Sequence, residues 1–148
     1  MPHNPVERFM NPTSVAFAGA SNNFTTMGTI QCMNLVSSGF PGEIYPVHPT
    51  EKTVLGLKAY PSVEELPAVP DLAVIVVPTR VALDLMEAFG RLGTKSVIVV
   101  TAGFRETGSP GRALERSLVE TARHYGMRFI GPNCLGIVNT HLPLNVTV

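Results

Sequence analysis

The residues best suited to chemistry in this chain are small ones at a predicted turn. Gly19, Ala20 and Ser21 follow a short apolar run, and Gly28 lies at the start of a stretch with helical periodicity. Such a turn exposes backbone N–H groups, and the following helix adds about half a positive charge at its N-terminus. The sequence therefore predicts a site for a phosphate-bearing ligand at this turn.

Reactive side chains elsewhere are isolated from one another. Histidines without an orienting partner rarely act in catalysis, and a lone cysteine is more often a small buried residue than a nucleophile. The spacing of metal ligands is absent as well. We therefore predict no catalytic residue and no metal site among the histidines, the cysteines and the one notable loop carboxylate, which are His3, His48, His124, His141, Cys32, Cys134 and Glu106.

The elements that must position the turn alternate along the chain. Apolar runs predict five strands, and amphipathic stretches predict the helices between them. This alternation requires a parallel sheet with helices on both faces. We expect an α/β fold, a Rossmann-like doubly wound parallel sheet of about five strands, with strands at 14–20, 43–48, 72–77, 96–101 and 127–130.

Three local details are expected within these elements. The helix at about 27–38 should bury Met27, Ile30 and Met33 on one face. Pro46 should bend its strand or leave its ladder incomplete, because proline lacks a donor. Ser109 should cap the helix that follows it, with proline at the first helical position.

The composition excludes several classes of protein. The 148 residues carry 11 basic and 11 acidic side chains, so the formal net charge is zero and nucleic-acid binding is disfavoured. No apolar run reaches the roughly 18 residues that a membrane helix needs. The N-terminus lacks the pattern of a signal peptide, so we expect a cytoplasmic protein with no membrane partner.

The chain divides into three expected parts. Residues 1–13 contain three prolines and form a lead-in, and residues 14–136 form the ligand-binding domain. Residues 137–148 have no stop signal and no tail composition, so we expect them to begin a connection to a following domain.

The identity of the ligand follows from what the turn lacks. The G-x-G-x-x-G fingerprint is absent, and no acidic residue ends the second strand to hold a ribose. Lys52, just beyond that strand, would instead attract an extra phosphate. NADP and coenzyme A (CoA) both carry one. The glycines are also compatible with tight helix–strand packing without a ligand, and Lys52 with a solvated surface lysine.

Four segments together resemble the N-terminal CoA-binding domain of the NDP-forming acyl-CoA synthetases, which are relatives of the succinyl-CoA synthetase alpha subunit. The resemblance covers about residues 8–148. The segments are Asn11–Ser21, Ile44–Pro49, Thr101–Gly108 and the Gly-Pro-Asn-Cys-Leu-Gly-Ile run at Gly131–Ile137.

The resemblance implies roles for individual residues. The turn after the first strand and the start of the following helix would hold the CoA phosphates. Lys52 and the Val-Pro-x turn at 77–79 would face the nucleotide. The loop at 101–103 would lie over the pantetheine arm, and Asn133 with Cys134 would lie near the thiol. The implied CoA-binding residues are Gly19, Ala20, Ser21, Asn22, Gly28, Lys52, Pro78, Thr79, Thr101, Ala102, Gly103 and Asn133. Two positions depart from the family pattern, because His48 replaces a common Asn and Thr50 a common basic residue.

The resemblance also implies a reaction, in which acyl-CoA, a nucleoside diphosphate and phosphate give the acid, free CoA and the triphosphate. That chemistry uses a phosphorylated histidine between glycines, which this chain lacks. We therefore expect CoA or acyl-CoA binding without turnover by this chain alone. Expected partners are the remaining synthetase domains or subunit, with a homo-oligomer possible in principle. The alternatives are an NADP-binding oxidoreductase domain, a stand-alone CoA-sensing or regulatory module, or part of a protein acetyltransferase.

Overall fold

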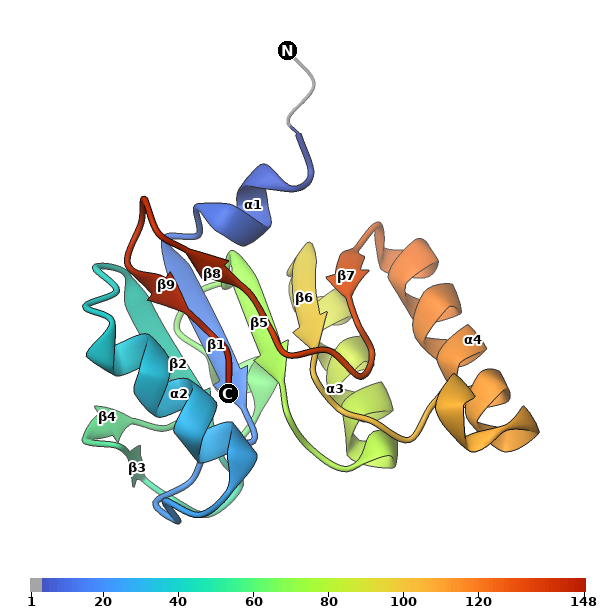
Figure 1. The fold of residues 1–148 in the computed structure, drawn as a ribbon, viewed down its shortest axis with the longest axis horizontal. Coiled ribbons are helices and arrows are strands. Elements are labelled where there is room, and N and C mark those ends of the chain that lie inside the picture. Colours follow the sequence, from blue (N-terminus) through green and yellow to red (C-terminus); the bar gives the residue numbers. More distant parts are fainter. Residues whose placement is uncertain (1–3) are drawn as a thin grey trace.

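A central five-stranded sheet organises the chain in the computed structural model, which describes residues 4–148 (Figure 1). Every neighbouring pair of strands in this sheet is parallel. The strand order is β2-β1-β5-β6-β7, with β1 at Ser14–Ala18, β2 at Glu43–Val47, β5 at Leu72–Ile75, β6 at Ser96–Val99 and β7 at Arg128–Ile130. The predicted α/β fold with a doubly wound parallel sheet is confirmed.

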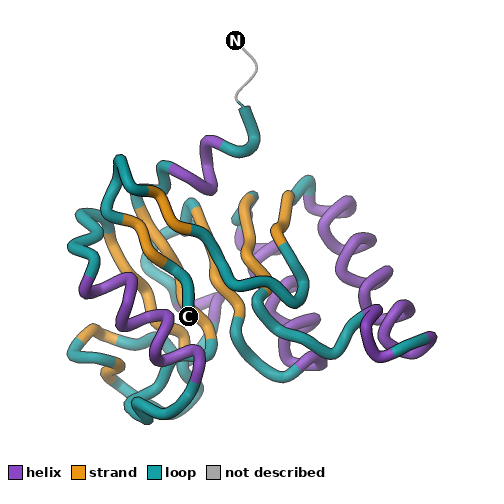
Figure 2. Tube along the Cα trace, in the orientation of Figure 1, coloured by secondary structure: helices purple, strands orange, loops and turns teal. Residues whose placement is uncertain are grey.

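Helices cover both faces of this sheet (Figure 2). One face packs against α2 (Met27–Ser37) and the C-terminal strands β8 (Val138–Asn139) and β9 (Leu144–Asn145). The other packs against α3 (Thr79–Leu92) and α4 (Ser109–Tyr125). The short helices are α1 (Glu7–Met10), η1 (Val63–Glu65) and η2 (Arg105–Thr107), and a small hairpin is formed by β3 (Thr53–Val54) and β4 (Leu57–Lys58).

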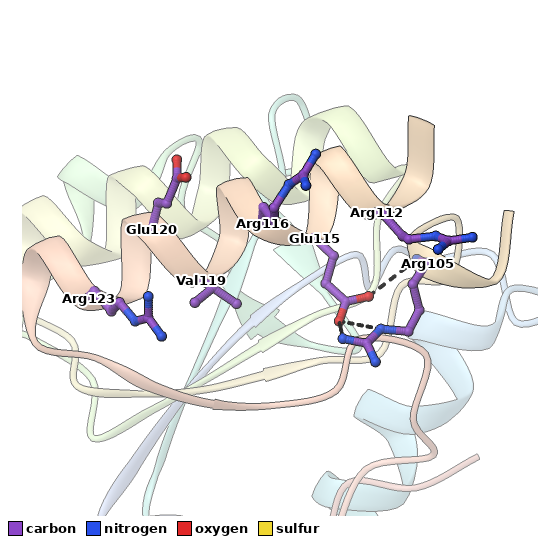
Figure 3. Close-up of a pocket in the computed structure, with 7 residues that line it drawn as sticks. All are labelled: Arg105, Arg112, Glu115, Arg116, Val119, Glu120 and Arg123. Atoms are coloured by element: carbon purple, nitrogen blue, oxygen red, sulfur yellow. Dashed lines mark hydrogen bonds and ion pairs between the residues drawn. The ribbon is translucent and has the colours of Figure 1, made fainter. Parts of the chain in front are cut away.

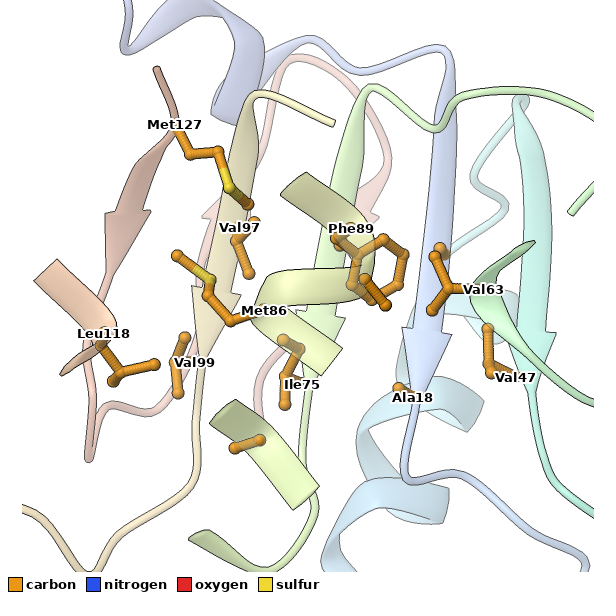
Figure 4. Close-up of a cluster of buried hydrophobic side chains, with 14 of the residues drawn as sticks. Ala18, Val47, Val63, Ile75, Met86, Phe89, Val97, Val99, Leu118 and Met127 are labelled. Atoms are coloured by element: carbon orange, nitrogen blue, oxygen red, sulfur yellow. The ribbon is translucent and has the colours of Figure 1, made fainter. Parts of the chain in front are cut away.

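Strand β1 shows how the sequence produces two cores. All five of its residues are buried, and successive side chains point to opposite faces. Ala16 and Ala18 face the cluster that includes Met86 and Phe89 of α3 (Figure 4), whereas Val15 and Phe17 face the α2 side. The apolar run without alternation therefore reflects a strand that is covered on both faces.

The buried face of α2 differs from the predicted one. Met27 is 51% exposed, and the buried residues of this helix are Gly28, Thr29, Gln31, Cys32 and Leu35. The prediction of a face made by Met27, Ile30 and Met33 is therefore wrong. The reason is steric, because the helix presents its glycine to the β1 turn, which brings polar Thr29 and Gln31 inside.

Pro46 does not interrupt the ladder between β1 and β2, so the ladder is not incomplete there as the sequence suggested. Pro46 pairs in register with Phe17, and pairing continues to Val47. Its carbonyl accepts a hydrogen bond from Tyr60 N at 2.9 Å, on the outer edge of the sheet. The backbone N–H that proline lacks would therefore point away from β1, toward the outer edge of the sheet. An edge strand tolerates the loss of a hydrogen-bond donor on that side.

The predicted cap of α4 is also wrong by one residue. Ser109 is the first residue of the helix, Gly108 occupies the N-cap position, and no side chain makes the capping bond. Gly108 has φ +100°, which a glycine adopts without steric cost.

Both ends of the described chain pack onto the sheet. Phe9 of α1 is buried in the α2-side core, together with Leu144 and Val146. The side-chain amide of Asn139 donates to the carbonyl oxygen of Met10 at 2.6 Å, which joins the two terminal segments. No helix within residues 4–148 combines the length and apolarity needed to cross a membrane.

Replacing Gly19 tests the packing at the end of β1. A Cβ at Gly19, where φ is +116°, would lie 1.9 Å from the carbonyl oxygen of Val76. We expect Gly19→Ala to lower the free energy of unfolding by more than about 2 kcal/mol. Gly56→Ala is the control, because φ there is +78° but a Cβ would meet nothing within 4 Å. It should lose only about 1 kcal/mol. Urea unfolding measures both, and equal losses would contradict the steric argument.

Candidate functional site

The candidate site lies at the carboxyl edge of the sheet, where the strand order changes direction. Strand β1 leads to α2 on one face, whereas its neighbour β5 leads to α3 on the other (Figure 1). Ligands of doubly wound sheets bind in the crevice that such a divergence creates. The turn predicted from the sequence follows β1 directly and thus borders this crevice.

Two glycines allow the turn to be compressed between its neighbours. A Cβ at Gly28 would lie 2.3 Å from the carbonyl oxygen of Gly19, and a Cβ at Gly19 would collide with Val76. The first turn of α2 therefore rests on the backbone of the β1 turn. This is the close packing left open as an alternative role for the glycines, and it also brings the N-terminus of α2 to the site.

A cluster of hydroxyl groups fixes the turn beyond Ala20. The Ser21 N–H donates to Thr29 Oγ1 at 2.9 Å, and the hydroxyls of Thr26 and Thr29 are 2.8 Å apart. The N–H groups of Ala20 and Asn22 have no hydrogen-bond acceptor among residues 4–148. The N-terminus of α2 has no side-chain cap and no acidic residue in its first turn. Unsatisfied donors and a positive helix end together favour an anion here.

The first of two cavities at this edge, the α3-side cavity, has a volume of about 550 Å³. It extends from the β1 turn to α3 and η1, and most of its lining is apolar. Its lining residues include Ala18, Gly19, Ala20, Ser21, Val47, His48, Pro49, Pro61, Val63, Val77, Pro78, Val81 and Leu85. Charged groups lie at its rim, where Arg91 and Glu64 form an exposed ion pair at 3.6 Å.

The second cavity, the β6-side cavity, has a volume of about 560 Å³. It lies between the loops that follow β5, β6 and β7. It shares Val77 and Pro78 with the α3-side cavity, so the two adjoin at the loop after β5. Its lining residues are Met27, Val76, Val77, Pro78, Thr79, Val100, Thr101, Ala102, Asn133, Cys134 and Leu135.

Two threonines brace the loops around the β6-side cavity. Thr101 Oγ1 donates to the Val77 carbonyl at 2.7 Å and accepts from the Val77 N–H at 3.2 Å. Thr79 Oγ1 donates to the Ala102 carbonyl at 3.0 Å. Because the hydroxyl of Thr101 is engaged on both sides, this residue shapes the cavity wall.

Glu106 orders the loop that carries Gly103. Its Oε1 accepts hydrogen bonds from the N–H of Gly103 at 2.5 Å and from that of Phe104 at 3.2 Å. The Gly103 N–H, followed by the other backbone donors, lowers the pKa of this carboxyl. The side chain of Glu106 is exposed, and it caps this loop.

The loop after β7 brings Asn133 and Cys134 to the β6-side cavity. The Asn133 N–H donates to the Thr101 carbonyl at 3.0 Å, and Cys134 Sγ lies 3.5 Å from the Val99 carbonyl. Burial raises the pKa of the Cys134 thiol. Cys32, on the buried face of α2, has its pKa raised to about 12 by burial. Neither sulfur has the environment of an activated nucleophile.

Eight of the twelve predicted residues line one of the two cavities or both, namely Gly19, Ala20, Ser21, Pro78, Thr79, Thr101, Ala102 and Asn133. Gly28 and Gly103 lie behind the walls as packing residues. Asn22 and Lys52 lie outside both linings. The carboxamide of Asn22 contacts the β3–β4 hairpin, and Lys52 immediately precedes that hairpin.

His48 also lines the α3-side cavity, although it was not predicted from the sequence as a CoA-binding residue. Its Nδ1 accepts hydrogen bonds from the N–H groups of Glu51 at 3.0 Å and Thr50 at 3.2 Å. The imidazole therefore closes the loop after β2 much as an Asn side chain closes an Asx turn. Its position at the carboxyl end of a parallel strand was the signal that could have identified it.

A further groove lies along α4 and η2 (Figure 3). It is lined by Arg105, Arg112, Glu115, Arg116, Val119, Glu120 and Arg123. The Arg105 guanidinium donates to Glu115 at 2.7 Å through Nε, and this contact lowers the pKa of Glu115. The groove shares no residue with either cavity. Within residues 4–148, no group of three potential metal ligands is present either.

Thiol reactivity tests the environment of the two cysteines. A raised pKa reduces the thiolate fraction at a given pH, so we expect both thiols of the native protein to react with Ellman's reagent at pH 8 at least about tenfold more slowly than in urea. In the Cys134→Ser variant only Cys32 can react, so the difference from the wild type shows which thiol accounts for the labelling of the native protein. Rapid stoichiometric labelling of native Cys134 would contradict this account.

The pH dependence of the Gly103 loop tests the role of Glu106. Because the pKa of the folded carboxyl is lowered, its stabilising contribution is complete above the ordinary value of 4.5 and is lost as the pH falls through the lower folded value. The amide resonances of Gly103 and Phe104 should therefore titrate together with a midpoint below 4.5. Glu106→Gln should abolish this titration, and its persistence would exclude Glu106 as the cap.

Comparison with known proteins reveals the family of this chain. Residues 13–140 match the family model described as a CoA binding domain. The chain is 46% identical over 142 residues to the alpha subunit of an ADP-forming acetate–CoA ligase II from Pyrococcus furiosus, covering 96% of this chain and 31% of the relative. It is 42% identical to an ADP-forming acetate–CoA ligase I from Archaeoglobus fulgidus, again over 96% of this chain but 20% of the relative.

Solved structures agree with this relationship. The PH0766 protein from Pyrococcus horikoshii OT3 superposes with a TM-score of 0.92 at 47% identity, covering 96% of this chain and 32% of that one. Acetyl-coenzyme A synthetase 1 from Ca. Korarchaeum cryptofilum gives the same TM-score at 41% identity over 96% of this chain and 31% of that one.

The chain spans about a fifth to a third of the length of the curated relatives it matches. The match favours CoA binding over the NADP-dependent oxidoreductase considered from the sequence. The family model covers most of the chain, the relatives named are more than 40% identical to it, and the solved structures share its fold. This chain belongs to the CoA-binding domain family and is homologous to the N-terminal part of the ADP-forming acetate–CoA ligases.

Proposed function

We propose that the chain binds CoA across both cavities, with the diphosphate at the β1 turn between them. The observation that carries this proposal is the junction of the cavities at Val77 and Pro78, beside the bare turn at Gly19 and Ala20. CoA has a matching order of parts, because an adenosine and a pantetheine arm flank its diphosphate.

The α3-side cavity suits the adenine ring. Ligand pockets are usually apolar with a few polar groups that fix orientation, and Val47, Val77, Val81 and Leu85 provide apolar surface here. Adenine presents two flat apolar faces and a polar edge. The imidazole of His48 lies in the same wall and can contact that edge or the ribose.

The diphosphate would accept hydrogen bonds from the turn and from the start of α2. The N–H groups of Ala20 and Asn22 have no acceptor among residues 4–148, and the first turn of α2 carries no acidic side chain. Backbone donors at a helix N-terminus form a common phosphate site. Lys52 makes no ion pair or side-chain hydrogen bond in the part of the chain that the structure describes, and we assign it to the 3′-phosphate of CoA.

The β6-side cavity would hold the pantetheine arm. Its wall combines apolar groups such as Val76 and Val100 with the polar backbone around Thr79, Ala102 and Asn133. The two amide groups of pantetheine need such backbone partners, and its methyl groups need apolar contact. The thiol end would then lie near Cys134, whose own protonated thiol would not compete with it.

We further propose that the chain is the CoA-recognition part of an NDP-forming acid–CoA ligase, for which CoA is a substrate. The relatives named above support this, since they are ADP-forming acetate–CoA ligases. The chain contains no glycine-flanked histidine, so the phosphoryl-transfer step would belong to the remaining domains or subunit. In this proposal residues 14–136 form the CoA-binding unit.

Isothermal titration with CoA tests the proposed site, and a charge in the α3-side cavity should weaken binding. Val81 is 44% exposed on the first turn of α3, so Val81→Asp should fold, and aspartate is favourable near a helix N-terminus. The carboxylate would be repelled by the negative phosphates and poorly solvated beside the adenine ring. We therefore expect the affinity for CoA to fall at least about tenfold.

Val69→Asp is the matched control for this titration. Val69 is 49% exposed and lines a hollow beside Gly93, apart from both cavities. Its CoA affinity should remain within about twofold of the wild type, since distant surface changes are usually near neutral. No binding of CoA by the wild type at millimolar concentration, or equal loss in both variants, would contradict the proposed site.

A further inference from the structure

The side chain of Asn22 joins the β1 turn to the β3–β4 hairpin. Its Nδ2 donates to the Thr53 carbonyl at 2.8 Å, and its Oδ1 accepts from the Leu55 N–H at 3.1 Å. A carboxamide that engages a carbonyl and an N–H two residues apart pairs with the chain as another strand would. Asn22 thereby holds a segment more than 30 residues away.

The hairpin needs this support at its turn. Strands β3 and β4 pair from Thr53 with Lys58 and from Val54 with Leu57, which leaves a two-residue turn of Leu55 and Gly56. Both turn residues have positive φ, +51° at Leu55 and +78° at Gly56. Asn or Gly is typical at such positions, and a leucine is strained there. The Asn22 carboxamide accepts the N–H of this strained residue.

The same hairpin carries Lys52. Lys52 lies one residue before Thr53, and its carbonyl accepts from the Ala59 N–H at 2.9 Å. Val54, between the two atoms that Asn22 holds, is fully buried in the α2-side core. The backbone on either side of Lys52 is thus fixed, by the Ala59 contact and by Asn22, whereas the Lys52 side chain is exposed.

We propose that Asn22 is a positioning residue that sets Lys52 beside the β1 turn, and that it thereby determines the preference for a ligand with a 3′-phosphate. The inference rests on the proposed function, because it takes Lys52 as the partner of that phosphate. Asn22 contacts the hairpin with its side chain, and its free backbone N–H remains available to the diphosphate. Its side chain therefore acts on affinity through Lys52.

Titration of CoA and dephospho-CoA, which lacks only the 3′-phosphate, tests this inference. The wild type should bind CoA about tenfold more tightly than dephospho-CoA, because the 3′-phosphate can form one charge-assisted hydrogen bond with Lys52. Asn22→Ala should remove most of this preference, and so should Lys52→Ala, while dephospho-CoA affinity changes less than about twofold. Asn23→Ala is the control, because within residues 4–148 the Asn23 side chain makes hydrogen bonds only to Thr25, in its own loop. Asn23→Ala should change the affinities for CoA and dephospho-CoA by the same factor, so that the preference for CoA is kept.

Rescue separates positioning from general damage. Leu55→Asn in the Asn22→Ala background gives the turn an Asn-Gly pair, which forms this type of turn readily. We expect the double variant to regain the preference for CoA. Without ligand, the Leu55 amide should exchange with solvent faster in Asn22→Ala than in the wild type, because its acceptor is lost.

Other outcomes would overturn the inference in distinguishable ways. If Lys52→Ala loses the preference and Asn22→Ala keeps it, Asn22 does not position Lys52, and the proposed CoA site still stands. If wild type binds both ligands equally, the inference fails although CoA binding remains. If wild type binds neither ligand, the proposed function fails as well, whatever the exchange of the Leu55 amide shows.

Discussion

The rest of the site depends on one close contact, the approach of two backbones at Gly19. The Val76 carbonyl lies against one side of this residue, and its own carbonyl meets Gly28 at the start of α2. Any side chain at either glycine would separate β5, the turn and the helix. Because they touch, the N-terminus of α2 and the loop after β5 converge, and both cavities adjoin the same turn.

The strands end earlier than the apolar pattern predicts, and this shortening creates the site. The pattern extends the first and third strands to Ala20 and Val77, but the structure ends them at Ala18 and Ile75. The residues in between leave the sheet and line the cavities. Periodicity cannot detect this difference, since a buried strand and the apolar wall of a pocket have the same composition. It predicted the parallel sheet with helices on both faces well, because these follow from the alternation of strands and helices and from the chirality of the crossovers.

The predicted α2 face failed for a related physical reason. The amphipathic pattern places Met27 on the buried face, whereas in the structure Gly28 faces the turn after β1 and Met27 is exposed. In the site, residues next to a strand end were identifiable from the sequence. The contacts of Asn22 with Leu55 and of His48 with its own loop were not, because they depend on side-chain geometry and, for Asn22, on two segments that are distant in sequence.

The central claim is that the bare turn at the end of β1 receives the diphosphate of CoA. Titrating isotope-labelled protein with CoA and following its backbone amide resonances tests it most directly. The account predicts that the amides of Ala20, Asn22 and the first turn of α2 shift most, together with those around Val77 and Ala102, while the amides near Gly93 stay unchanged. Large shifts confined to the α4 groove, with the turn unaffected, would contradict it.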